Sequence, residues 1–229
     1  MARSILDVIR APAPGMRQVA HSGAMPGFVT VALWILVSLL AAGLGLLLGG
    51  FASVDELLEG LPPGTVPQNV DEASLEGIVV GAQAAGIGLR ALWPLLYWAV
   101  LTLVMYLVTK LFGGAGSLSG MFGAMGVACI PFVISGLVQL VVTGGQAASV
   151  SAGAPQALII ALGAVGALVS VAALIWHVAL VVIGASAARG LGYGGSAGSC
   201  ATSCAAVIGI PLLLLFLVGG VLTLLGGGG

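Results

Sequence analysis

Residues 156–183 read QALIIALGAVGALVSVAALIWHVALVVI and contain no Asp, Glu, Lys or Arg. The hydrocarbon core of a bilayer is about 30 Å thick, so an α-helix needs ~20 apolar residues to cross it. This stretch is long enough to do so. Further uncharged apolar stretches occur at 27–50, 91–109, 121–143 and 201–225. We therefore predict an all-α integral membrane bundle of five transmembrane helices.

The composition excludes a soluble globular fold. Of 229 residues, 60% are hydrophobic and only 6% are charged, and the mean hydropathy is +1.24. Soluble domains carry about 25% charged residues. We expect a single transmembrane domain over 1–229, with a cytoplasmic interfacial start at 1–26 and an acidic external loop at 51–76.

The charges between the predicted spans are sorted by sign. If the spans alternate in direction, five of the six cations lie on one side of the membrane: Arg3, Arg10, Arg17, Lys110 and Arg189. Six of the seven acids lie between the first two spans, on the opposite side. Cytoplasmic segments are enriched in Lys and Arg. This predicts a cytoplasmic amino terminus and an external carboxyl terminus, and we expect the protein in the plasma membrane.

The segment before the first span is basic and partly apolar. SILDVIRA at 4–11 predicts a short interfacial helix that ends at the prolines of 12–14, with a disordered tail as the alternative. An interfacial helix would hold its cations against anionic lipid headgroups. The predicted membrane-surface residues are Arg3, Arg10 and Arg17.

Arg90 is compatible with two interpretations. In the first, Arg90 and Lys110 reach the headgroups at the two ends of the second span, and 77–89 forms an interfacial extension. In the second, one long helix starts near Glu76, and Arg90 lies in the protein interior as a functional charge. We favour the first, because a long side chain reaches the headgroups at little cost. Aromatic residues at 93–98 are typical of an interfacial belt.

The second and third spans resemble the fourth and fifth at an offset of 80 residues. Pro131 matches Pro211, each after an isoleucine, and GGAGSLSG at 113–120 matches YGGSAGS at 193–199. This indicates a parallel repeat of two helical hairpins. The two prolines are expected to kink their helices. The kinks would either frame a cavity or hinge, or shape the bundle; we favour shape, because no polar residue accompanies them.

These features resemble the Yip-domain family, polytopic membrane proteins named for eukaryotic members that interact with Rab-type GTPases. The quoted stretches that carry the resemblance are SILDVIRAPAP at 4–14, MRQVA at 16–20, VACIPFVISGLV at 127–138, IWHVALVVIG at 175–184 and GLGYGGSAGSCA at 190–201. The resemblance implies five spans and a cytoplasmic amino terminus. The chain lacks the long soluble amino-terminal segment of the eukaryotic members, and it resembles the compact prokaryotic version.

Candidate reactive residues are few. His177 is the one titratable base within the predicted spans, and it is either a proton-relay or ligand group or a neutral histidine hydrogen-bonded to a carbonyl, Ser or Thr. Cys200 and Cys204 share a helix face, as an S-acylation site, half of a metal site, or packing residues, which we favour. The GxSxG letters at 194–198 lack the strand and the acid that a hydrolase requires.

We therefore predict no catalytic, cofactor-binding or metal site, and no nucleic-acid partner. The leading hypothesis is a non-enzymatic Yip-type protein that binds the bilayer, other membrane proteins or itself, and organises or shapes the membrane. The alternative is an oligomeric channel or transporter for a small or weakly polar solute. That alternative would gain if five polar residues converged on one cavity: Ser135, Gln139, Ser170, His177 and Thr202. The candidate functional residues are His177, Arg90, Pro131, Pro211, Cys200 and Cys204.

Overall fold

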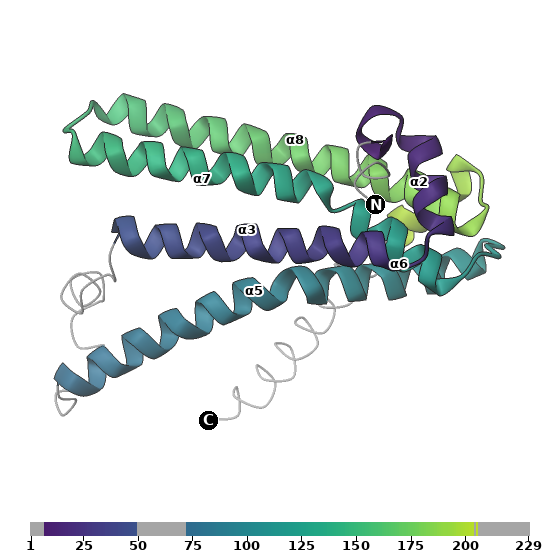
Figure 1. Cartoon of the computed structure of the whole chain (residues 1–229), viewed down its shortest axis with the longest axis horizontal. Helices are drawn as coiled ribbons and strands as arrows, with labels where there is room; N and C mark the ends of the chain where they lie inside the picture. The colour runs from purple at the N-terminus through teal and green to yellow at the C-terminus, as the bar shows by residue number, and fades with distance from the viewer. Residues whose placement is uncertain (1–6, 50–71, 204, 206–229) are drawn as a thin grey trace, which may run out of the picture. The chain divides into compact units, whose positions relative to one another are not determined.

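The computed structural model describes residues 7–49, 72–203 and 205. Within these ranges, all regular structure is helical (Figure 1). The helices are α2 (Pro12–His21), α3 (Met25–Gly49), α5 (Glu72–Leu111), α6 (Leu118–Val127), α7 (Ile130–Ser151) and α8 (Gln156–Arg189), with further helical residues at 7–10 and 193–203. The predicted all-α class is confirmed.

Four helical stretches in the described part of the chain are long and apolar enough to cross a membrane. They are Met25–Gly45, Ala84–Leu111, Leu118–Ser151 and Gln156–Arg189. They correspond to the first four predicted spans. Most of the fifth predicted span, 201–225, lies outside the described residues, as do most of the predicted external loop at 51–76 and the residues Arg3, Cys204 and Pro211.

The chain divides into two compact units, and the long helices contribute residues to both. Unit 1 is formed by Met1–Phe28, Trp98–Ala128 and Val178–Gly229, and unit 2 by Val29–Tyr97 and Cys129–His177. Each unit has its own set of interhelical contacts, so the two are described separately.

In unit 1, α2 packs against α6, and α6 also lies against the start of α3 at main-chain distance. A Cβ built on Gly126 of α6 would lie 2.6 Å from both the carbonyl carbon and the carbonyl oxygen of Gly27. A Cβ on Gly123 would overlap the carbonyl of Gly23. Only glycine allows this closeness. The side chains of Met16, Val19, Met121 and Met125 are fully buried around these contacts.

In unit 2, α7 and α8 run side by side and are joined by a short turn (Figure 1). Gln139 of α7 donates from Nε2 to the carbonyl of Gly166 at 2.7 Å and to the hydroxyl of Ser170 at 3.0 Å, both on α8. Gln146 donates to the carbonyl of Ile159 at 3.2 Å. These amide side chains therefore link two otherwise apolar helices, as is common between helices in membranes.

The third predicted span is broken rather than kinked. α6 ends at Val127 and α7 begins at Ile130, so Pro131 lies in the first turn of α7. Proline is tolerated there because the N–H groups of a first turn have no acceptor within the helix. The prediction of a proline kink inside one continuous helix at Pro131 was wrong. Two turn residues separate the helices instead.

The prolines at 12 and 14 follow the end of one short helix and lie at the start of the next, α2. The predicted short helix is present at 7–10, and Pro12 then occupies the first turn of α2. Ala11 separates the two with an extended backbone, at a φ of −144°. The alternative of a disordered tail is wrong for the described residues from Asp7 onward.

Candidate functional site

Unit 2 contains a buried histidine. His177 of α8 is only 2% exposed, and its Nε2 lies 2.8 Å from the hydroxyl of Tyr97 on α5. Which of the two groups donates depends on the histidine tautomer. The hydrogen bond satisfies a polar ring in an apolar setting. The tyrosine partner was missed in the sequence, where Tyr97 was assigned to an interfacial belt.

Aromatic rings from α3, α5 and α7 surround this pair. The Phe132 ring of α7 lies 4.5 Å from the His177 ring, and Trp34 of α3 stacks on Phe132 at 4.9 Å. The Tyr97 ring meets the Trp34 ring edge-to-face, with 5.8 Å between the ring centres. The centre of the Trp93 ring, which is tilted relative to Tyr97, lies 6.4 Å away. Such arrangements are the favoured geometries of aromatic pairs. The cluster therefore holds α3, α5, α7 and α8 together in unit 2.

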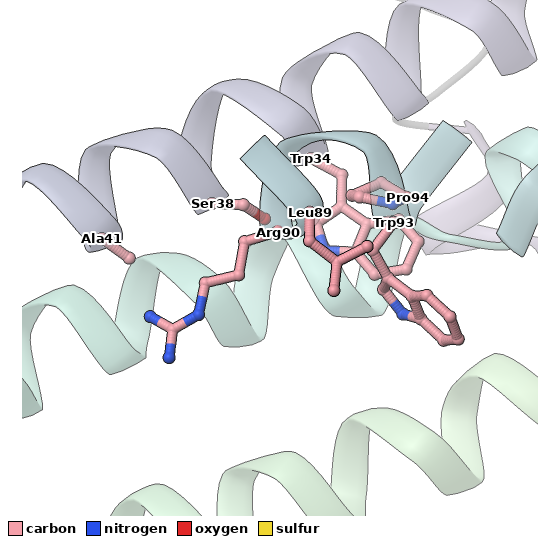
Figure 2. A pocket seen from close by; sticks show the side chains of 7 residues that line it. All are labelled: Trp34, Ser38, Ala41, Leu89, Arg90, Trp93 and Pro94. Carbon is pink, nitrogen blue, oxygen red and sulfur yellow. The ribbon is translucent and has the colours of Figure 1, made fainter. Parts of the chain in front are cut away.

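A cavity of about 400 Å³ adjoins the tryptophans of this cluster. Its lining residues are Trp34, Ser38 and Ala41 from α3, and Leu89, Arg90, Trp93 and Pro94 from α5 (Figure 2). Arg90 is the one charged residue among the described residues of that lining, and its side chain is exposed. The guanidinium extends away from the tryptophan rings in Figure 2. The site combines a cation, two indole rings and a hydroxyl.

The helix that carries Arg90 is continuous. α5 runs from Glu72 to Leu111, and its membrane-length apolar stretch begins at Ala84 and includes Arg90. The predicted interfacial extension at 77–89 is part of this same helix. The long helix agrees with the second interpretation of the sequence, although the Arg90 side chain lines a cavity and is not enclosed in a core.

Unit 1 contains a buried arginine that the sequence did not single out as a structural residue. Arg189, the last residue of α8, is 2% exposed. Its Nε donates to the hydroxyl of Thr109 at 3.1 Å, and its two terminal nitrogens donate to the carbonyls of Gly114 and Gly116. The guanidinium lies 4.4 Å from the centre of the Tyr106 ring, a cation–π contact. These neutral acceptors and the negative end of the α8 dipole stabilise the cation.

Both units contain a hydrogen bond between residues 80 positions apart. Tyr97 pairs with His177 in unit 2, and Thr109 pairs with Arg189 in unit 1. In each case, a residue of α5 meets a residue of α8 at the sequence offset at which the repeat was predicted. The glycine-rich segments differ, because 113–117 forms a loop while 193–199 is helical.

A second cavity, of about 260 Å³, lies in unit 1 beside α2. Arg17 of α2 and Tyr193 line it, together with residues at the carboxyl end of α8. Arg17 and Arg10 are both exposed, as residues at a membrane surface would be. The Ser186 hydroxyl on its wall donates to the carbonyl of Leu191 at 2.6 Å.

The remaining candidates do not form a reactive centre in the described residues. Cys200 is a buried cysteine in the helix 193–203. No group of three or more His, Cys, Asp or Glu side chains able to hold a metal occurs among the described residues. Ser196, the serine of the GxSxG letters, lies buried within the same helix instead of at a turn between a strand and a helix.

The five polar residues whose convergence would favour a transporter are dispersed. Gln139 meets Ser170, while His177 bonds with Tyr97. Thr202 donates to a carbonyl of its own helix at 2.9 Å. Neither of the two cavities described above is lined by any of the five.

Comparison with known proteins agrees with the helical membrane architecture. The Yip1 domain matches residues 6–221. No curated protein and no solved structure matches the chain. Since the match covers nearly all of the sequence, and the described part contains four membrane-length apolar helices, this integral membrane protein belongs to the Yip1 domain family.

Proposed function

We propose that this Yip1 domain protein is a non-enzymatic membrane protein that binds other membrane proteins, or further copies of itself, through helix faces within the bilayer. By doing so it would organise or shape the membrane. Five spans, a cytoplasmic amino terminus, an external carboxyl terminus and residence in the plasma membrane belong to the same proposal. The sorted charges of the sequence support this topology.

The observation that carries the proposal is an open glycine face on α5. Gly77, Gly81 and Gly88 lie on one side of the helix at about 100° per residue. All three are exposed, and within the described part of the chain a Cβ on any of them would have no neighbour within 4 Å. Small residues let a second helix approach closely in a membrane, where association depends on packing. This face is available for such a helix.

Replacing Gly81 with Leu is expected to weaken self-association about tenfold, which corresponds to ~1.4 kcal/mol. The leucine side chain would hold a partner helix away from the α5 backbone. The measurement is energy transfer between donor-labelled and acceptor-labelled copies in phosphatidylcholine vesicles, as a function of the protein-to-lipid ratio.

Gly86→Leu is the matched control for this experiment. Gly86 is also exposed and open on α5, but it lies about 140° around the helix from Gly81. The control should associate like the unchanged protein. Equal energy transfer for the unchanged protein and both variants would contradict the use of this face.

A channel or transporter for a small or weakly polar solute is the second candidate. It is favoured by the two hydrogen bonds at the 80-residue offset, since parallel repeats around a central axis are common in transporters. The dispersed polar residues count against it. We expect glycerol to enter protein-containing vesicles no faster than protein-free vesicles, as measured by light scattering after rapid mixing. Faster entry that disappears on Tyr97→Phe or His177→Ala substitution would favour the transporter instead.

A further inference from the structure

Arg90 places a positive charge inside an apolar helical stretch. Arg90 lies within the membrane-length stretch Ala84–Leu111, and the sequence before it, at 77–89, carries no charge either. Cations at such positions normally find an anion, a carbonyl or the headgroup layer. Among the described residues, the lining of the adjacent cavity contains no carboxylate. The positive charge of this site therefore lacks a balancing anion among the residues that form its walls.

The rest of the cavity is suited to an amphiphile. Trp34 and Trp93 bring large apolar rings with an N–H group on each, and Ser38 brings a hydroxyl. Leu89, Ala41 and Pro94 complete an apolar wall. A volume of about 400 Å³ falls within the ~300–1,000 Å³ range of small-molecule sites. It accommodates a phosphate, a glycerol unit and the first carbons of acyl chains, while longer chains would extend into the bilayer.

We propose that this cavity binds one anionic phospholipid, with its phosphate on the Arg90 guanidinium and its glycerol region against Trp34 and Trp93. The planar guanidinium offers paired N–H donors that match phosphate oxygens. A lipid with a net negative charge neutralises the cation, whereas a zwitterionic lipid brings a second cation to the same site. The bound lipid is thus a phospholipid such as phosphatidylglycerol, selected over phosphatidylcholine.

The lipid site is separate from the glycine face proposed for protein association. Arg90 lies about 180° around α5 from Gly81. One side of the helix can therefore hold a lipid while the other contacts a protein. The two proposals fail independently, because one is measured by energy transfer between copies and the other by lipid selectivity.

The test is quenching of tryptophan fluorescence by lipids with brominated acyl chains. The full-length protein is placed in phosphatidylcholine vesicles that contain equal amounts of bromine, carried either by phosphatidylglycerol or by phosphatidylcholine. We expect about fivefold preferential quenching by the brominated phosphatidylglycerol, equivalent to ~1 kcal/mol. Trp34 and Trp93 report on the cavity, and the other two tryptophans contribute a background common to all samples.

Arg90→Gln is expected to abolish the preference, and Arg90→Lys to keep most of it, because lysine retains the charge. Ser38→Phe should abolish it by filling the cavity while leaving Arg90 in place. An unchanged protein that does not distinguish the two lipids, or an Arg90→Gln variant with the full preference, would overturn the proposal.

Discussion

Arg189→Ala is expected to lower the free energy of unfolding by about 3 kcal/mol, one of the two largest effects that we predict for this protein. The substitution removes three donors that reach Thr109, Gly114 and Gly116. It also leaves a space beside the Tyr106 ring. Two main-chain carbonyls would then lose their partner in a partly buried loop, and an acceptor without a donor costs ~1–3 kcal/mol. Unfolding by SDS in mixed micelles, followed by far-ultraviolet circular dichroism, measures the difference.

Two further variants separate the geometry of Arg189 from its charge. Arg189→Lys keeps the positive charge at the end of α8 but loses the planar fork and its stacking on Tyr106. It should recover about half of the lost stability. Arg10→Ala removes an exposed arginine and should change stability by less than about 0.5 kcal/mol. If Arg189→Ala were as mild as Arg10→Ala, the buried guanidinium would not hold the glycine loop.

Gly126→Ala is expected to destabilise the protein by about 3 kcal/mol, although alanine is the better helix former. The new Cβ would lie 2.6 Å from the carbonyl carbon and oxygen of Gly27. These are main-chain atoms, so no rotamer change relieves the overlap. The start of α3 would have to move away from α6 and give up part of a contact in which Gly27 and Gly126 are both buried. The same SDS titration measures this loss.

Gly86→Ala is the matched control, because it makes the same substitution where a Cβ meets nothing within 4 Å among the described residues. There the helix preference of alanine should dominate and stabilise the protein by about 0.5–1 kcal/mol. The two glycine substitutions should thus have opposite signs. The same sign for both would mean that α6 and α3 can separate without loss.

Residue types predicted the helices well but their ends poorly. The uncharged run at 27–50 corresponds to α3, and Pro26 lies in its first turn. The uncharged run at 121–143 gives no sign of the break between α6 and α7 that precedes Pro131. In α5, the predicted span starts only at residue 91, directly after Arg90, although the helix begins at Glu72. Hydropathy reports transfer into lipid, whereas helix ends depend on local hydrogen bonds and caps.

The candidate sites were only partly predictable. His177 stood out as an isolated polar residue, but its partner Tyr97 is typical of interfacial residues by its position in the sequence. Arg189 contributed to the predicted topology as one of several cytoplasmic cations. Its burial under the glycine loop depends on a contact with Thr109, 80 residues earlier in the chain. Neither pairing has a local sequence signal.

The sequence by itself determined that this protein is a helical membrane protein, because apolar length and composition decide partition into a bilayer. Its place in the Yip1 domain family rests on the match over residues 6–221. Only the tertiary structure decided which side chains meet. It paired Tyr97 with His177, enclosed Arg189 and placed Arg90 beside two tryptophans. The physical reason is that each helix has many apolar faces of similar lipid affinity. The rotation of a helix is therefore set by close contacts with its neighbours, such as that between Gly126 and Gly27.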